Sequence, residues 1–222
     1  LIHPNILQDV NGEYPMMESL KVGHTTGNRY TVFSLWDTYR NVSTLMTLLY
    51  PERQLDIIRT MLDMYRENGW LPKWELYGRE TFTMEGDPSI PYIVDAWMRG
   101  LRDFDEQTAY EAMRKGATTP GEFNLLRPDA NDYFSKGYVP LREQYDNSVS
   151  HALEYYIADF ALSRFADALG KKKDAEMFYK RSLGYKHYYS KEFGTFRPIL
   201  PDGTFYSPFN PRQGENFEPN PG

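Results

Sequence analysis

The sequence contains no cysteine, so disulfide bonds, thiolate metal sites and a cysteine nucleophile are excluded. No run of apolar residues approaches the roughly 20 residues that are needed to span a bilayer. Basic residues are not in surplus either, because 25 Lys and Arg stand against 31 Asp and Glu, giving a net charge of −6. A nucleic-acid partner requires a basic stripe, so we expect none.

Aromatic residues are what the chain has in quantity. Its 222 residues include 18 Tyr, 13 Phe and 4 Trp, which is 16% of the chain. Most of these side chains suit the core of a single domain, or of a large part of one, at this length. Sugar-binding clefts also use aromatic rings, because the ring face stacks on the apolar C–H face of a pyranose.

Apolar residues recur at three- and four-residue steps along much of the chain, a pattern that predicts helices with one buried face. We predict helices near residues 35–49, 52–68, 90–102, 106–116, 148–168 and 173–189. The expected fold class is all-α, with antiparallel helical pairs and long loops. Residues 1–30 are predicted to be an irregular lead-in, 118–140 a loop-rich region and 195–222 an irregular tail with minor strands around 196–199 and 204–205.

Asp37 and Trp36 form the first candidate site, at the predicted start of a helix. A carboxylate there is favoured by the positive end of the helix dipole, so capping beside a buried Trp is one interpretation. The other is a carboxylate that accepts hydrogen bonds from sugar hydroxyls beside an apolar wall. Taken alone, the two interpretations are equally favoured.

Residues 70–87 favour the second interpretation. This loop-like segment places Trp70 and Trp74 close to Glu75, Glu85 and Asp87. Aromatic surface in a loop must either pack beneath it or face a cleft. Aromatic walls with interleaved carboxylates are typical of carbohydrate pockets, so we predict that this segment lines one.

His151 and Glu154 lie three residues apart on one face of a predicted helix. Such a pair is able to supply two ligands to a metal, but a metal site needs more convergent groups. We therefore predict a buried, hydrogen-bonded pair and assign no metal ligands.

Four segments together resemble glycoside hydrolase family 92: Ser34–Arg40 (SLWDTYR), Gly69–Trp74 (GWLPKW), Met84–Pro88 (MEGDP) and Ser150–Tyr156 (SHALEYY). The resemblance implies a calcium-dependent, inverting exo-α-mannosidase, of α-1,2 type, that removes terminal mannose from glycans. It also implies an (α/α)6 toroid preceded by a β-sandwich domain, of which residues 1–222 are the N-terminal portion of the toroid. Many members are exported by bacteria, which implies a secreted, periplasmic or cell-surface protein.

The family segments that carry the catalytic acid, the catalytic base and the calcium ligands have no counterpart in this sequence, so we expect them beyond residue 222. Gly214-Glu215-Asn216 echoes the acid segment with its letters out of order, and we do not assign Glu215. The part of the family's active site that the resemblance assigns to this sequence is the wall of the −1 sugar pocket. Its predicted residues are Trp36, Asp37, Trp70, Trp74 and Asp87, with Glu75 and Glu85 behind them.

Two other readings share these features. Another (α/α)-toroid enzyme, such as a glucoamylase-like hydrolase or a polysaccharide lyase, has the same helical pairs and aromatic cleft. A non-catalytic α-solenoid interaction module has the helical pairs alone. Release of mannose, of glucose or of uronate products separates the first reading from the mannosidase, and protection of the fold by mannose separates the second.

Overall fold

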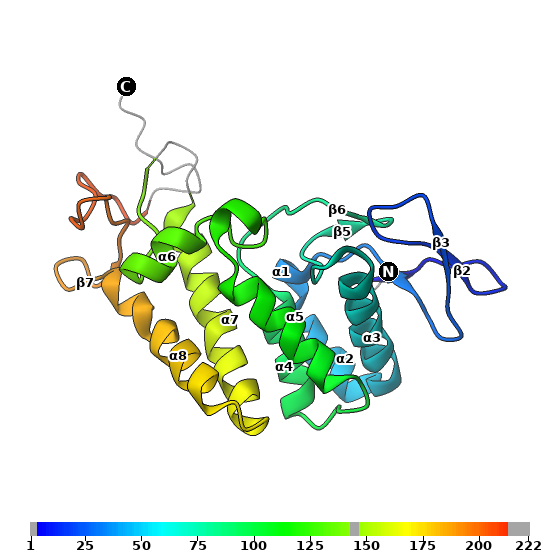
Figure 1. The fold of residues 1–222 in the computed structure, drawn as a ribbon. Coiled ribbons are helices and arrows are strands. Elements are labelled where there is room, and N and C mark those ends of the chain that lie inside the picture. Colours follow the sequence, from blue (N-terminus) through cyan, green and yellow to red (C-terminus); the bar gives the residue numbers. More distant parts are fainter. Residues whose placement is uncertain (1–3, 143–146, 213–222) are drawn as a thin grey trace.

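The computed structural model describes residues 4–142 and 147–212. Its helices are α1 (Leu35–Thr38), α2 (Val42–Leu49), α3 (Pro51–Asn68), α4 (Ser89–Met98), α5 (Glu106–Thr118), α6 (Ala130–Lys136), α7 (Ser148–Ala168) and α8 (Lys172–Ser182). Short 3-10 helices occupy Gly121–Phe123 and Leu183–His187. Figure 1 shows the long helices packed against one another as a bundle, called the helical layer below, with α7 and α8 as an antiparallel pair at one side of it. The predicted all-α fold of helical pairs is confirmed.

Within the residues that the structure describes, four two-stranded antiparallel ladders lie on the helical layer. They join β1 (Asn5–Ile6) to β4 (Tyr30–Thr31), β2 (Glu13–Pro15) to β3 (Val22–His24), β5 (Glu75–Leu76) to β6 (Arg79–Glu80), and β7 (Tyr189–Ser190) to β8 (Thr195–Phe196). The lead-in and the aromatic segment are thus hairpins where we predicted irregular chain. The strand predicted around residues 196–199 covers part of β8, and Ile199 bridges Phe205.

Helix α3 illustrates how the sequence builds the layer. Pro51 occupies its first turn, where a missing N–H costs nothing. Leu55, Ile58 and Met61 form its buried stripe. Gly69 ends the helix with φ 86°, a left-handed conformation that glycine adopts without the strain a Cβ imposes.

Three predicted helix boundaries were wrong. The helix expected over 35–49 breaks at residues 39–41, where Tyr39 and Arg40 bond to Glu154 on α7 and turn the chain. The helix expected to reach residue 102 ends at Met98, and the chain reverses at Gly100 with φ 101°. The last helix ends at Ser182 and continues only as 3-10 turns.

Helix α6 was missed within the region predicted to be loop. Its seven residues contribute buried Ala130 and Tyr133, and Gly137 ends it in the left-handed conformation. So short a helix carries too little periodicity to be distinguished from a loop. It is held by tertiary contacts, since the Tyr133 ring packs against the rings of Tyr155 and Tyr156 on α7.

Candidate functional site

The loops of interest gather at one end of the helical layer. Figure 1 shows the connection that precedes α4 along the upper edge of the molecule, where α7 begins. Segment 34–40 reaches the same end, because the backbone N–H of Leu35 bonds to the carbonyl of Lys73 at 3.3 Å. The ends of α3 and α5 also meet there, where Nζ of Lys115 donates to the carbonyl of Gly69 at 2.7 Å.

Segment 34–40 is attached directly to α7. Nη2 of Arg40 lies 2.6 Å from Oε1 of Glu154, and the Tyr39 hydroxyl donates to Oε2 of the same carboxylate at 2.7 Å. The Arg40 guanidinium also stacks 4.9 Å above the Trp36 ring. Burial, followed by the hydrogen bond to Glu154, raises the pKa of Tyr39 above its usual range. The Tyr39 phenol therefore stays a hydrogen-bond donor throughout the neutral range.

The side chains of Trp36 and Asp37 project from this anchored segment. Asp37 lies in the first turn of α1 and is exposed, which leaves its carboxylate accessible to a ligand. Trp36 is partly buried, and its indole N–H has no acceptor among the described residues. A buried donor of this kind is costly to leave unpaired, so this position favours an oxygen acceptor.

Glu85 is bound to the first turns of α7. Its Oε1 accepts from the Asn147 side chain at 2.9 Å, and its Oε2 lies 2.7 Å from Nε2 of His151. The other ring nitrogen of His151 lies 3.2 Å from Oδ2 of Asp129 and 3.2 Å from the Tyr155 hydroxyl. The prediction that His151 and Glu154 pair with each other was wrong, because each binds a different loop.

Segment 69–74 is also held by the partly buried carboxylate of Glu80. Glu80 accepts from the backbone N–H groups of Lys73, Trp74 and Phe82 at 2.7, 2.9 and 2.8 Å. Burial raises the pKa of Glu80, although these three bonds oppose that change. Trp70 lies under the Lys115 ammonium, 4.5 Å from the ring centroid.

Glu75 lies inside the molecule. It is fully buried and accepts from the Thr31 hydroxyl and from the backbone N–H groups of Val32 and Gly78. Burial raises the pKa of this carboxyl, and the Gly78 bond opposes the rise. Its bonds tie β4 to the turn between β5 and β6, so in this structure Glu75 supports the aromatic segment from behind.

Asp87 is also buried. Its Oδ2 lies 3.2 Å from Nε of Arg127, whose Nη1 lies 2.8 Å from Oδ1 of Asp159. All three side chains are at most 2% exposed. Burial raises the pKa of Asp87, while the Arg127 charge opposes the rise. Asp87 thus anchors the start of α4 to the segment after α5 and to α7.

The structure therefore divides the seven predicted residues. The segment that carries Trp36 and Asp37 binds the first turns of α7 through Arg40 and Glu154, and Glu85 binds them through His151, although the two segments are about fifty residues apart in sequence. Glu75 and Asp87 lie beneath the loops, and Trp74 is partly buried. Trp70 lines a cavity of about 370 Å³ together with the β2–β3 turn.

Arg40, His151, Glu154 and Arg127 join these loops, and none of them was predicted as a site residue. Arg40, His151 and Glu154 lie within the segments that carry the resemblance, so that resemblance was the signal by which they could have been found. Arg127 sits between a Leu and a Pro in a region predicted to be loop, and nothing in the sequence marked it as fully buried.

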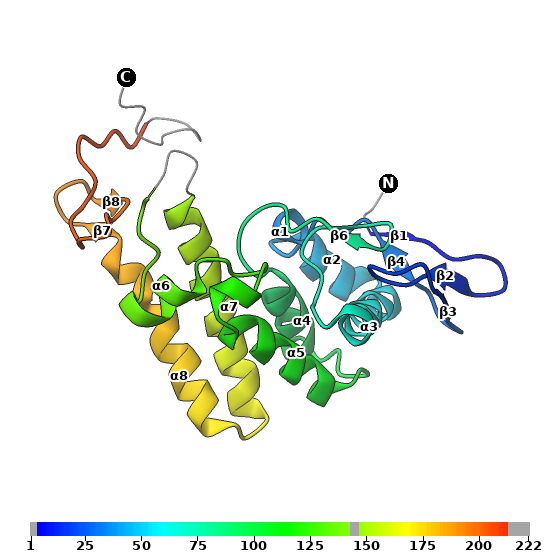
Figure 2. The same ribbon diagram turned by 45° about the horizontal axis from the view of Figure 1, so that its top comes forward.

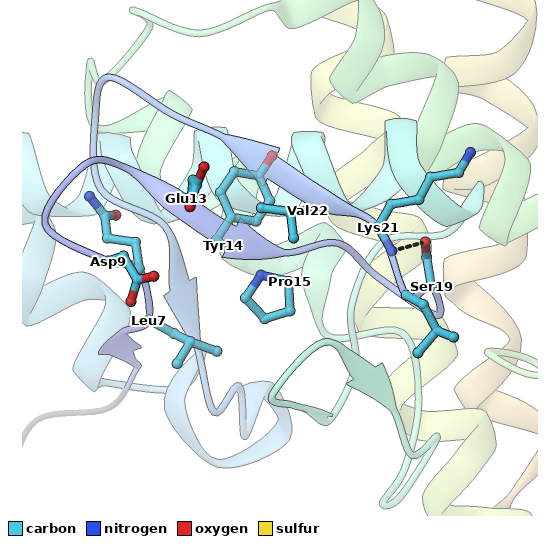
Figure 3. A pocket seen from close by; sticks show the side chains of 10 residues that line it. Leu7, Asp9, Glu13, Tyr14, Pro15, Ser19, Lys21 and Val22 are labelled. Carbon is cyan, nitrogen blue, oxygen red and sulfur yellow. Dashed lines mark hydrogen bonds between the residues drawn. The ribbon is translucent and has the colours of Figure 1, made fainter.

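A second cavity, of about 430 Å³, lies on the β2–β3 hairpin. Figure 3 shows Tyr14, Pro15 and Val22 along it, with Leu7 on the neighbouring segment. None of its lining residues belongs to the four segments of the resemblance. This cavity is therefore not part of the candidate site.

Comparison with known proteins identifies the family. The model of the glycosyl hydrolase family 92 catalytic domain matches residues 1–221. The chain belongs to glycosyl hydrolase family 92. The predicted resemblance is thereby confirmed.

Solved family 92 structures extend the likeness to three dimensions. A family GH92 α-mannosidase from Bacteroides thetaiotaomicron, in complex with mannoimidazole, is 33% identical with a TM-score of 0.84 over 95% of this chain. A family GH92 inverting mannosidase from the same species is 30% identical with a TM-score of 0.83 over 93% of it. The helical pairs are thus part of the (α/α)6 toroid of family 92 catalytic domains.

A more distant relative is an uncharacterized secreted glycosidase from Arthroderma benhamiae, 28% identical over 156 residues, which is 65% of this chain. The chain spans 20% of that relative and 27% and 28% of the two bacterial structures.

Family 92 implies calcium, an ion that takes six to eight oxygen ligands. Within residues 4–142 and 147–212, no three His, Asp or Glu side chains are grouped so that they could hold a metal ion. The best acidic candidates, Asp87 and Asp159, already neutralise Arg127. The described residues therefore do not fit a calcium site. No helix among them is long and apolar enough to cross a membrane.

Proposed function

We propose that this chain is part of the catalytic domain of an inverting exo-α-mannosidase that removes terminal mannose, of α-1,2 type, from glycans. Within it, Trp36, Asp37 and Glu85 form part of the wall of the −1 sugar pocket, flanked by Trp70 and Trp74. Glu75 and Asp87 support that wall from behind. The observation that carries the proposal is the meeting of the four family segments at one end of the helical layer. Mannoimidazole binding by a 33% identical relative supports mannose as the sugar.

The chemistry of the wall follows from the groups it presents. Asp37 accepts hydrogen bonds from two sugar hydroxyls, and a charged acceptor makes such bonds roughly twice as strong as a neutral one. Trp36 offers a ring face to the C–H face of the sugar. These contacts hold the terminal sugar and favour its distorted form, which lowers the barrier only where they tighten in the transition state.

Inversion also needs an acid on one side of the glycosidic bond and a base-activated water on the other, with carboxyl groups roughly 6.5–9.5 Å apart. We place both groups in other parts of the enzyme, together with the calcium ligands. The partners of this chain are then a mannose-containing glycan, the remainder of the toroid and a β-sandwich domain. A secreted, periplasmic or cell-surface location is supported by the secreted glycosidase among its relatives.

The Asp37→Ala variant of the complete enzyme tests the pocket. We expect kcat/KM on an aryl α-mannoside to fall by at least ~10²-fold, because a charged hydrogen bond is worth about 1.5–3 kcal/mol and its loss leaves sugar hydroxyls unpaired. Asp167→Ala, at the far end of α7, is the matched control. Equal kcat/KM in the two variants would remove Asp37 from the pocket.

A second assay tests whether the catalytic acid and base lie outside residues 1–222. Residues 1–222 alone should release no product from the aryl α-mannoside in millimolar calcium, because each missing proton transfer costs about 10²–10⁴-fold. Calcium-dependent release by this fragment would place the acid and base within it. The complete enzyme, assayed against α-mannosides, α-glucosides and uronates, separates the proposal from another toroid hydrolase or a lyase.

A further inference from the structure

Glu154 stands where two of the sugar-site loops meet on α7. It is a nearly buried carboxylate, 10% exposed, whose ion pair is with Arg40 of segment 34–40. We infer that Glu154 is a positioning residue, which sets the Trp36–Asp37 wall through Arg40. This inference rests on the proposed function for the meaning of that wall.

The contacts run in one line from α7 to the wall. Both oxygens of Glu154 are occupied, one by Arg40 at 2.6 Å and one by the Tyr39 hydroxyl at 2.7 Å. The Arg40 guanidinium is in turn stacked over the Trp36 ring at 4.9 Å and over the Tyr39 ring at 4.8 Å. A planar guanidinium bound at its edge and stacked at its face has little freedom left, so it transmits the position of Glu154 to the Trp36 ring.

Glu154 also fixes the position of the second loop, segment 84–88. Gly86 has φ 76°, and a Cβ added to it would lie 2.4 Å from Cβ of Glu154. The loop of segment 84–88 therefore lies flush against α7 at this residue, which fixes where neighbouring Glu85 emerges. One turn of α7 thus sets the spacing between Trp36 and Glu85.

A purely stabilising role explains this arrangement less well. Arg40 is 43% exposed, and ion pairs with exposed partners contribute little to stability. The α1–α2 break at residues 39–41 is also the point at which Tyr39 and Arg40 reach Glu154. This interruption of the helix lies directly beside Trp36 and Asp37.

The test uses the complete enzyme with Glu154→Gln, Arg40→Gln and the double variant. Gln keeps the shape of Glu154 and removes its charge, whereas Gln in place of Arg40 is shorter and removes both the charge and the stacked guanidinium. Asp167→Asn is the matched control, because Asp167 is also on α7 and holds Lys172 at 2.7 Å at the other end of the helix. We expect Glu154→Gln to lower kcat/KM about 10–100-fold, since a misplacement of about 1 Å costs on the order of 10²-fold.

Two further readouts separate positioning from folding. The double variant should lose no more kcat/KM than the more damaged single variant, because both changes break the same link. In protein labelled with 5-fluorotryptophan, the Trp36 resonance, assigned with Trp36→Phe, should shift in Glu154→Gln and Arg40→Gln while Tm stays at the value of Asp167→Asn.

Each outcome decides one of the two claims. If the wild-type enzyme releases no sugar from any α-mannoside, the proposed function fails, and the fluorine resonance alone still decides whether Glu154 positions Trp36. If the enzyme is active but the Trp36 resonance in Glu154→Gln does not move, the inference is overturned. Fully additive losses in the double variant, or a fall in Tm that matches the loss of activity, overturn it as well.

Discussion

At the scale of single residues, buried ion pairs connect the loops to the helices. Arg127 is fully buried between Asp87 and Asp159, and Asp159 also accepts from the Tyr133 hydroxyl at 2.9 Å. Burying an ion is expensive unless it is paired and hydrogen-bonded. The arrangement therefore stabilises the fold only while all its members are present.

The variant Asp87→Asn tests this role. We expect it to lower the free energy of unfolding by about 3–5 kcal/mol, because removing one partner of a buried pair leaves the other charge uncompensated. Denaturant unfolding of wild type and variant measures the difference, with Asp167→Asn as the exposed control. Wild-type stability combined with lost activity would instead make Asp87 a sugar contact.

At the scale of elements, the β2–β3 hairpin is attached to α3 by one polar cluster. The Tyr14 hydroxyl donates to Oε1 of Glu67 at 3.0 Å, and Arg29 binds both oxygens of that carboxylate. Burial, followed by the Glu67 charge, raises the pKa of Tyr14 to about 12.

The raised pKa of Tyr14 predicts how the stability of the fold changes with pH, which unfolding experiments at several pH values measure. The folded form holds the Tyr14 proton more tightly than the unfolded chain, whose tyrosines titrate near 10. The contribution of Tyr14 to stability is present below pH ~10 and is lost as the pH rises from ~10 through ~12. In Tyr14→Phe this part of the decline in stability should be absent. An identical decline in both proteins, followed by unfolding at each pH, would contradict the assignment.

Helix α5 begins at a local cap. The Asp105 side chain accepts from the backbone N–H of Thr108 at 3.0 Å and from its hydroxyl at 2.6 Å. Asp105→Ala should therefore cost about 1 kcal/mol of unfolding free energy, the usual value for a lost N-cap. Asp105→Asn keeps the acceptor and serves as control. A similar loss in both variants would point to the Arg66 ion pair rather than the cap.

At the scale of the whole molecule, both sides of the helical layer carry exposed apolar residues. Figure 2 shows α7 and α8 at one side and α2 and α3 at the other. On α2, Leu45, Leu48 and Leu49 are 54%, 66% and 59% exposed, and on α7 Ile157 and Phe160 are 42% and 50% exposed. Exposed apolar side chains that recur on one helix in this way are typical of an interface.

We expect residues 1–222 alone to self-associate through these faces, because in the proposed enzyme the rest of the toroid covers them. Sedimentation velocity should show oligomers whose share falls in the Leu45→Gln, Leu48→Gln double variant. Lys172→Gln, an exposed change on α8, should leave the distribution unchanged. A monomeric wild-type fragment at high concentration would refute the expectation.

The sequence by itself determined the helical layer and the family. Helix periodicity is a local property, so α3, α5 and α7 were predicted to within a few residues. The four segments of the resemblance were equally local. Neither kind of pattern depends on what the remainder of the chain does.

Only the tertiary structure decided which carboxylates lie at the surface of the site. Glu75, Glu85 and Asp87 stand within thirteen residues of one another, and nothing local distinguishes them. Burial of Glu75 depends on Thr31, and burial of Asp87 depends on Arg127, each about forty residues away. The break beside Trp36 and Asp37 depends on Glu154, more than a hundred residues away. A charged group takes its role from the partners that surround it, and those partners are assembled only when the helices pack.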